Sequence, residues 1–498
     1  MTDLIPFPEF QQIRDALQIP TEFAPAVLAE AAAASQRDFS ALPSLQAIPF
    51  VTIDPPTSRD LDQAFFAARH GAGYEVHYAI ADVGFFVPRG GALEQEAWRR
   101  GLTMYSPDLK TPLYPPSLSE GAASLLPDVQ RPSIAFSFVL NPRAEVLSLT
   151  VRRGVIRSRA KLSYAEVSAH LEAERTSPNS GTLAGYEWSD ALSLLEAIGR
   201  RRQQLEVERG GVSLRIPAQQ VERWSTALYG YRLAFEEASP VEEWNAQISL
   251  MTGMAAAQLM LNHGVGLLRA LEPPRPERVR MLRLTALALH VAWPKGMEYD
   301  EFVRSLNPKE PLHAVLLHQA ARVTGGARYV AFTGEVKAWH SAIAAPYAHV
   351  TAPPRRLADR YALDLLVELA NGHSPDEETI DTLYQLPQVM NEAERLSRQL
   401  ENAIVDLAEA RLMQQRVGEV FTAMVIGLRH EGVIVQITDP PIRTLLPAAI
   451  WNAAEEPHLS NDGARLTIAG TSIALGQTLS LRLEEANLKT RSLSFSLA

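Results

Sequence analysis

The sequence has 498 residues, 46% of them hydrophobic, which is enough for about three domains with sizeable cores. It contains no cysteine, so disulfides, thiol nucleophiles, Cys-ligated zinc and iron–sulfur clusters are excluded. No hydrophobic stretch is long enough to span a membrane and no secretory signal is apparent, so we expect a soluble cytoplasmic protein without a membrane partner. Because 57 Asp and Glu outnumber 47 Lys and Arg, giving a net charge of −10, a polyanionic partner would need a local basic groove.

The first 46 residues predict two short amphipathic helices, residues 10–17 and 22–34, separated at Pro20. We expect both to pack against the rest of the chain. The alternative is part of a helix-turn-helix that reads DNA. It is disfavoured because residues 22–34 contain no Lys or Arg with which a recognition helix could contact DNA.

The central part of the chain begins with strand patterns and continues with helix patterns, which predicts an α+β domain. The expected strands are residues 50–53, 74–80, 134–140 and 147–156, with Asn141-Pro142-Arg143 as a hairpin turn. The expected helices are residues 189–207, 241–261, 281–291, 312–323, 357–369 and 391–415, with the acidic segment 374–382 as a loop.

Residues 417–498 return to short strand patterns separated by Gly, Pro, Asn and Asp. The expected strands are residues 421–428, 433–437, 443–447, 464–469 and 479–483. Five short strands in about 80 residues predict a small five-stranded barrel of the OB type.

Three carboxylates form the most informative cluster in the sequence. Asp60 and Asp62 point to the same side of an extended segment, and a Pro-rich loop can bring Asp54 back towards them. Carboxylates that share a pocket repel unless a divalent cation neutralises them, and all-oxygen ligands favour magnesium or manganese over zinc. The alternative interpretation is an acidic turn capped by its own side chains. The sequence has no phosphate-binding glycine loop, zinc-binding H-E-x-x-H motif or serine nucleophile elbow, so metal-assisted hydrolysis remains.

The segment from Asp54 to Gln63 resembles the D-x5-D-x-D-D signature of the ribonuclease II (RNB) family of exoribonucleases. Further segments resemble family motifs in the same order between residues 48 and 401. They are Tyr78-Ala79-Ile80-Ala81-Asp82-Val83, residues 113–126, Lys161-Leu162-Ser163-Tyr164 and Thr351-Ala352-Pro353-Pro354-Arg355-Arg356. The resemblance implies an N-terminal helical segment (1–46), an RNB catalytic domain (47–415) and an S1-like OB-fold domain (416–498).

This resemblance implies hydrolytic 3′-to-5′ degradation of single-stranded RNA to nucleoside 5′-monophosphates, with Mg²⁺ or Mn²⁺ as cofactor. By motif position, Asp54, Asp60 and Asp62 are expected metal ligands, and Arg355 is expected to contact the scissile phosphate. We also expect the RNA 3′ end to enter a buried channel, DNA not to be a substrate, and the protein to be a monomer.

Three further residues are expected to bind RNA. Tyr105 resembles the family's aromatic residue near the 3′-terminal base, Tyr164 the tyrosine beside the terminal ribose, and Glu401 an acidic residue that helps to read the 2′-OH. A 2′-OH contact distinguishes RNA from DNA.

Two residues depart from the family pattern. Gln63 stands where the family has a fourth aspartate, and it can coordinate a metal only through a neutral oxygen. Aliphatic Ile216 lies near the expected place of a second clamping aromatic residue. The alternative function is therefore an RNA-binding protein of the same fold whose catalysis is impaired at Gln63.

The domain composition also departs from the family pattern. The family commonly has two cold-shock domains before the catalytic domain, and this sequence has about 45 helical residues there instead. RNA binding would then depend on the C-terminal barrel, although residues 417–498 carry six Lys and Arg against eight Asp and Glu. A barrel used mainly for packing is the alternative. A wider entrance would favour duplex RNA with a 3′ overhang.

Overall fold

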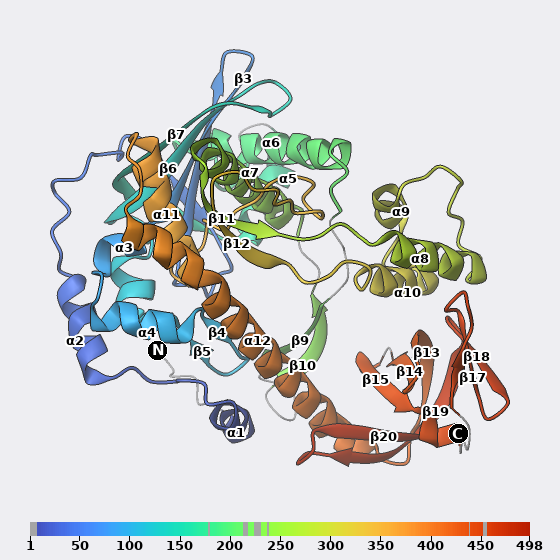
Figure 1. The fold of residues 1–498 in the computed structure, drawn as a ribbon. Coiled ribbons are helices and arrows are strands. Elements are labelled where there is room, and N and C mark those ends of the chain that lie inside the picture. The colour runs from blue at the N-terminus through green and yellow to red at the C-terminus, as the bar shows by residue number, and fades with distance from the viewer. Residues whose placement is uncertain are drawn as a thin grey trace.

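The chain forms a six-stranded mixed sheet covered by helices, followed by a small β-barrel, which confirms the predicted α+β class (Figure 1). The computed structural model describes residues 7–177, 180–212, 218–223, 231–236, 239–437, 439–451 and 456–498. The predicted position of Ile216 lies outside the described residues.

The main sheet has the strand order β7-β6-β3-β2-β1-β8. Its strands are β1 (Val51–Ile53), β2 (Gln63–His70), β3 (Gly73–Ala81), β6 (Gln130–Leu140), β7 (Val146–Arg157) and β8 (Ala160–Leu162). All neighbouring pairs are antiparallel except β1 and β8. The hairpin turn at Asn141 is present as predicted, and its side chain accepts hydrogen bonds from the backbone N–H groups of Arg143 (2.9 Å) and Glu145 (3.0 Å). Strand β2 was not predicted, because its alanines have weak strand propensity.

Helices cover this sheet and share one hydrophobic core with it. This core holds β1 and β2, which flank the loop that carries Asp54, Asp60 and Asp62. The helices of this part are α3 (Val83–Phe86), α4 (Ala92–Arg100), α5 (Tyr164–Thr176), α6 (Ser189–Glu208), α7 (Pro240–His263) and α11 (Leu357–Ala370), with the π-helical turn η1 (Leu118–Ala122). A short hairpin, β4 (Met104–Tyr105) and β5 (Lys110–Thr111), lies next to α12. Each predicted helix in this part is present within a few residues.

Two strand pairs and three helices lie between the main sheet and the barrel in the chain. The strand pairs are β9 (Ala218–Arg223) with β10 (Tyr231–Glu236) and β11 (Val265–Ala270) with β12 (Arg328–Thr333). The helices are α8 (Pro276–Ala288), α9 (Tyr299–Ser305) and α10 (Pro311–Ala320). Buried residues of α8–α10 belong to the same hydrophobic cluster as those of the barrel, so the barrel packs against these helices.

Helix α12 (Glu377–Met413) runs from α11 and β12 to the barrel, a length of about 55 Å at 1.5 Å per residue. The predicted loop 374–382 is wrong from Glu377 onwards, and the helix begins well before the expected residue 391. Asp376 caps the helix by accepting a 2.8 Å hydrogen bond from the N–H of Thr379, and acidic residues in a first turn are favourable next to the helix dipole. The acidic composition that suggested a loop is therefore that of a helix N-terminus.

The C-terminal barrel is nearly closed and five-stranded, as predicted, but one of its strands was misplaced. Its order is β15-β14-β13-β19-β20, and β15 also contacts β20. The strands are β13 (Val420–Arg429), β14 (Gly432–Ile437), β15 (Ile442–Pro447), β19 (Thr478–Asn487) and β20 (Ser492–Leu497), with short helical turns η2 (Gln414–Arg416) and η3 (Ala448–Trp451).

The run 464–469 was predicted to be a barrel strand, and this prediction is wrong. It forms β17 (Arg465–Ile468) in a separate sheet with β16 (His458–Leu459) and β18 (Thr471–Ala474). Leu466 and Ile468 bury their side chains there. The fifth barrel strand is β20, whose alternating Ser, Leu and Phe residues place Phe495 in the core.

The N-terminal helices α1 (Pro8–Ala16) and α2 (Pro25–Ala34) pack against the main body, as predicted. Arg14 and Asp108 form a fully buried two-pronged ion pair, with both N–O distances at 2.9 Å. Glu30 accepts a 2.6 Å hydrogen bond from the N–H of Ala92 at the start of α4. Helix α1 therefore supports the segment that carries the β4–β5 hairpin.

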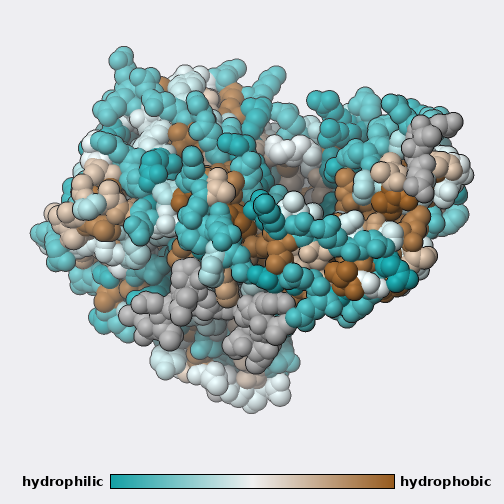
Figure 2. All heavy atoms as spheres, turned by 90° about the horizontal axis from the view of Figure 1, so that it is seen from below, coloured by the Kyte–Doolittle hydropathy of each residue, from teal (hydrophilic) through white to brown (hydrophobic). Residues whose placement is uncertain are grey.

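Seen from the side of α1 and the barrel, the surface is mostly hydrophilic, and its hydrophobic residues lie in separate small patches (Figure 2). Within the described part of the chain, no helix combines the length and the apolar composition needed to cross a membrane.

Candidate active site

The three carboxylates predicted to share a pocket lie on the loop that joins β1 to β2. Asp54 follows β1, and its N–H donates to the carbonyl of Leu162 in β8 (2.9 Å). Further along the loop, Ser124 Oγ accepts from the N–H of Leu61 (3.0 Å) and donates to the carbonyl of Arg59 (2.6 Å). These contacts fix the loop backbone on both sides of Asp60.

Burial makes the charged form of two of the carboxylates, Asp54 and Asp62, unfavourable. Burial, followed by the charge of Asp62, raises the pKa of Asp54 to about 7. Burial also raises the pKa of Asp62 to about 6, although the neighbouring Arg355 opposes the rise. Oδ2 of Asp54 and Oδ1 of Asp62 are buried without a hydrogen-bond partner. Such oxygens are costly unless a cation or a proton satisfies them.

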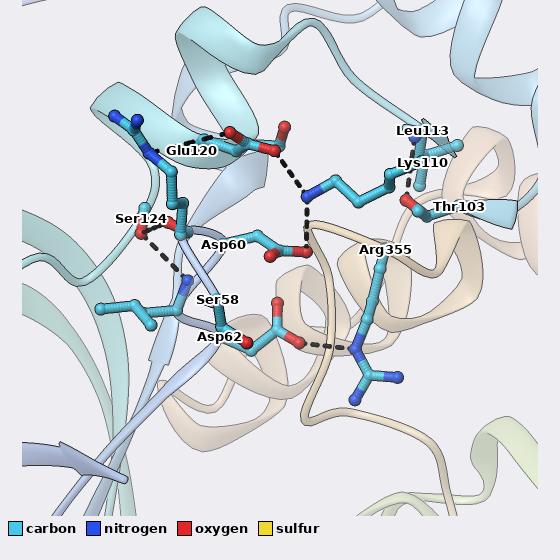
Figure 3. A network of polar contacts seen from close by, with 12 residues as sticks. Ser58, Asp60, Asp62, Thr103, Lys110, Leu113, Glu120, Ser124 and Arg355 are labelled. Carbon is cyan, nitrogen blue, oxygen red and sulfur yellow. Dashed lines mark hydrogen bonds and ion pairs between the residues drawn. The ribbon is translucent and has the colours of Figure 1, made fainter. Parts of the chain in front are cut away.

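Arg355 contacts this cluster directly. Its Nε donates a 2.7 Å hydrogen bond to Oδ2 of Asp62, and its terminal nitrogens point away from that carboxylate (Figure 3). The side chain is 41% exposed. The loop that carries it is held by buried Asp359, which accepts from the N–H of Ala352 (2.8 Å) and from two nitrogens of Arg356 (both 2.9 Å). Arg355 is therefore held in place through Nε, and the N–H groups of its terminal nitrogens are directed away from Asp62.

Gln63 is the first residue of β2, and its side chain is already engaged. Nε2 donates to the backbone carbonyl of Thr351, which precedes the arginine loop. The Thr351 hydroxyl forms a 2.9 Å hydrogen bond with that of Ser249. An aspartate at position 63 could not make the first of these contacts, because a carboxylate has no donor.

Lys110 and Glu120 also belong to the site, and sequence reasoning missed both. Lys110 Nζ lies 3.1 Å from Oδ2 of Asp60 and 2.6 Å from Oε1 of Glu120 (Figure 3). They lie on a two-residue strand and a single π-helical turn, where no periodicity marks a functional side chain.

The structure places the two predicted tyrosines near the carboxylates. Tyr105 in β4 is 49% exposed, and burial of its hydroxyl together with the charge of Asp60 raises its pKa. Tyr164 begins α5, and burial and the charge of Asp54 raise its pKa to about 12. Each tyrosine therefore has a different carboxylate as its principal charged neighbour.

Glu401 lies apart from these contacts. It is exposed on α12 and accepts a 3.0 Å hydrogen bond from Ser397. Among the described hydrogen bonds and ion pairs, none joins Glu401 to the carboxylates, to Arg355 or to the tyrosines.

The donor set fits a hard divalent cation in part. Two buried carboxylate oxygens, on Asp54 and Asp62, lack partners, and oxygen-only ligands suit magnesium or manganese. Asp60 is paired with Lys110 instead. Accordingly, within the described ranges no group of three or more Asp, Glu, His or Cys side chains is arranged as a complete metal site.

Comparisons with known proteins identify the family. Residues 42–372 match the RNB domain, so the chain belongs to the RNB family. Ribonuclease R of Escherichia coli (strain K12) is 24% identical over 487 residues, covering 91% of this chain and 57% of the relative. The chain thus spans little more than half the length of that relative.

Solved structures share the fold. Apo RNase R of Mycoplasma genitalium has a TM-score of 0.86 at 19% identity, covering 98% of this chain and 77% of that one. The same RNase R has been solved with ribose-methylated single-stranded RNA and with double-stranded RNA. Yeast Ssd1, described as a pseudonuclease, has a TM-score of 0.67 at 15% identity, covering 92% and 58%. The fold therefore occurs both with and without nuclease activity.

Proposed function

We propose that this protein is a metal-dependent exoribonuclease that hydrolyses single-stranded RNA from its 3′ end and releases nucleoside 5′-monophosphates. The observation that carries the proposal is the pair of buried, unpartnered oxygens on Asp54 and Asp62 beside the partly exposed side chain of Arg355. A divalent cation would stabilise these carboxylate oxygens, and the neighbouring Arg355 could bind a phosphate. The family and the RNA complexes of a structural neighbour support RNA as the substrate.

Asp54, Asp60 and Asp62 would hold Mg²⁺ or Mn²⁺, and Gln63 would add at most a neutral oxygen. Bound divalent cations supply Lewis-acid activation and charge neutralisation for phosphodiester hydrolysis. The three carboxylates lie on one loop. Burial and their mutual repulsion disfavour their negative charges, and a bound cation would relieve both effects.

Arg355 would donate its terminal N–H groups to the scissile phosphate, where a guanidinium stabilises the charge that develops during cleavage. Its bond to Asp62 would align these groups without consuming them. Arg355 would thus act on the reacting phosphate, and Asp62 would keep its side chain in place.

Tyr105 and Tyr164 would bind the last nucleotides of the RNA in the buried channel. The exposed ring of Tyr105 offers a stacking surface, which is typically worth about 1–3 kcal/mol per base and is tolerant of sequence. Tyr164 would lie beside the terminal ribose. Glu401 would need to contact the RNA from α12, and a 2′-OH contact there would exclude DNA.

The proposed domains are residues 1–46, 47–415 and 416–498, the last an S1-like domain that binds RNA upstream of the cleaved end. The complex of a structural neighbour with double-stranded RNA supports duplex RNA with a 3′ overhang as a further substrate. We further propose that the protein is a monomer. We also propose a cytoplasmic location, with which a chain without cysteine is compatible.

The second candidate is an RNA-binding protein of the same fold with impaired catalysis. It is favoured by Gln63, whose amide donates to Thr351 rather than adding a fourth negative charge. The existence of a pseudonuclease with this fold is consistent with it.

A time course with 5′-labelled RNA decides between the two, run with Mg²⁺, with Mn²⁺ and with EDTA beside DNA of the same sequence. Progressive shortening of RNA alone, abolished by EDTA, supports the exoribonuclease. Intact RNA with both metals, together with a gel shift, supports the non-catalytic relative.

A further inference from the structure

The ammonium group of Lys110 lies between two carboxylates, 3.1 Å from Asp60 Oδ2 and 2.6 Å from Glu120 Oε1 (Figure 3). We propose that Lys110 is an internal cation that competes with the divalent metal for Asp60, and that Glu120 retains the ammonium when Asp60 binds the metal. Lys110 and Glu120 are thus positioning residues that set the metal affinity. The inference rests on the proposed function, because it assumes that Asp60 is a metal ligand.

The three side chains come from separate, well-anchored segments. Asp60 lies on the loop before β2, Lys110 opens β5 and pairs with Tyr105 across the hairpin, and Glu120 lies in η1. Because each backbone is fixed, only the flexible stem of the lysine needs to move for the ammonium to change partners.

The burial of the pair permits such a change. The side chains of Lys110 and Asp60 are 24% and 15% exposed, so the pair is neither freely solvated nor locked in the core. An exposed pair would offer little competition, because solvent screens the attraction between its charges. A fully buried pair would be too costly to break.

Charge makes the two partners of Asp60 mutually exclusive. An ammonium and a divalent cation on one carboxylate would repel each other strongly at about 4 Å. Glu120 offers an acceptor that Lys110 already contacts, so the ammonium need not be released into the pocket. Arg59 is a second cation near that carboxylate, with Nε 4.0 Å from Oε2 of Glu120.

The cations near the carboxylates differ in whether they have another carboxylate to pair with. Arg355, Lys110 and Lys161 act on Asp62, Asp60 and Asp54 respectively. Lys161 is held at a distance by donating to the carbonyls of Pro56 (2.7 Å) and Ser58 (2.6 Å). Among these three cations, Lys110 is the one that has a second carboxylate to which it can move.

The test measures Mn²⁺ binding to the full chain without RNA, from the signal of free Mn²⁺ in electron paramagnetic resonance. We expect Lys110→Met to bind Mn²⁺ about three- to fivefold more tightly than the wild type, the upper part of the range that a partly exposed ion pair implies. Glu120→Gln should bind it more weakly, because the ammonium then has only Asp60. Lys110→Arg keeps the charge and should stay close to the wild type.

Two controls separate this competition from a general charge effect. Lys295→Met removes an exposed positive charge outside the site and should leave Mn²⁺ affinity unchanged. In an Asp60→Asn background, Lys110→Met should give no gain, whether Mn²⁺ binds weakly or not at all. An equal gain with and without Asp60 would overturn the inference, since a long-range effect does not need that carboxylate.

Thermal unfolding in EDTA verifies that each variant is folded, and Lys110→Gln serves as a second neutral variant with the same expectation. Wild-type Mn²⁺ affinity in both neutral variants would overturn this inference and leave the proposed function standing. Failure of the wild type and both neutral variants to bind Mn²⁺ would overturn the proposed function together with the inference.

Discussion

The Nε of Arg355 donates a 2.7 Å hydrogen bond to Asp62, although 293 residues separate the two positions. The guanidinium opposes the effect of burial on the pKa of Asp62, and its remaining N–H groups stay directed away from that carboxylate. We expect Arg355→Ala to lower the rate of RNA hydrolysis by about 10²–10³, a typical effect of losing one charge-stabilising donor. Single-turnover kinetics with saturating RNA measure this rate.

The same variant should lower the free energy of unfolding by roughly 1–3 kcal/mol, because Asp62 would be left buried without a partner. Arg398→Ala is a matched control, since that arginine is 65% exposed on α12. It should change neither the rate nor the urea midpoint. An Arg355→Ala enzyme with the wild-type rate would exclude a contact with the scissile phosphate.

Asp54 should make the stability of the protein depend on pH in EDTA. Its pKa is about 7 in the folded state, above the ordinary value of 3.8, so the folded chain prefers the protonated carboxyl. Stability should therefore fall as the pH rises from about 4 to about 7 and remain low above that. We expect Asp54→Asn to be more stable than the wild type by up to about 4 kcal/mol at about pH 8, with the gain vanishing towards about pH 4.

Urea unfolding at a series of pH values measures this difference. Asp38→Asn is the control, because Asp38 is exposed and hydrogen bonds from Ser40 lower its pKa. Its effect should not change between about pH 5 and about pH 8. A constant difference between Asp54→Asn and the wild type over that range would show that Asp54 is not held as a buried carboxyl.

Much of the arrangement around Asp62 could be predicted from the sequence. The ordered motifs indicated that the carboxylate loop and the Thr351–Arg356 segment belong to one family site, and Gln63 contacts Thr351 as Asp62 contacts Arg355. The β-strand and helix patterns predicted most elements, because their apolar residues repeat with the period of the structure.

Residues whose role depends on tertiary contacts could not be found in this way. Lys110 and Glu120 meet Asp60 only because a hairpin and a π-helical turn pack beside its loop. The sequence did not predict the fifth barrel strand, because β20 is rich in serine and Phe495 is the one buried residue among its six. The beginning of α12 was mistaken for a loop because a capped acidic helix start has the composition of one.

Replacing Gln63 by aspartate should have two opposing effects. The variant loses the donor to the Thr351 carbonyl and places a carboxylate beside it, which should cost roughly 1–3 kcal/mol of stability in EDTA. The added charge should strengthen Mn²⁺ binding, so part of the loss should return when Mn²⁺ is present. Thermal unfolding with EDTA and with Mn²⁺ measures both effects.

Gln63→Ala is the matched control, because it loses the same hydrogen bond without adding charge. It should be destabilised in EDTA and gain no extra stability from Mn²⁺ beyond that of the wild type. If Gln63→Asp and Gln63→Ala respond equally to Mn²⁺, position 63 does not face the metal.

The barrel should contribute to the binding of long RNA. Gly432 opens β14 with a φ of +151°, and an added Cβ would overlap the carbonyl oxygen of Leu446 in β15. We expect Gly432→Ala to disturb the β14–β15 pairing and to weaken the binding of long RNA, while the hydrolysis of oligonucleotides too short to reach the barrel continues. Gel shifts and product analysis measure the two effects.

Gly325→Ala is the control, because a Cβ there meets no atom within 4 Å and the backbone needs no positive φ. It should bind long RNA like the wild type. Equal affinity of Gly432→Ala and the wild type, in a variant shown to have a disturbed barrel by its unfolding curve, would assign the barrel to packing alone.

The central claim is that the carboxylate site around Asp62 hydrolyses RNA, and one comparison tests it most directly. Wild-type protein and Asp62→Asn, both verified to be folded, are incubated with Mg²⁺ or Mn²⁺ and a 5′-labelled single-stranded RNA. We predict that the wild type shortens the RNA from its 3′ end and releases nucleoside 5′-monophosphates, while Asp62→Asn binds the RNA and leaves it intact. Equal turnover by the two proteins would contradict the claim.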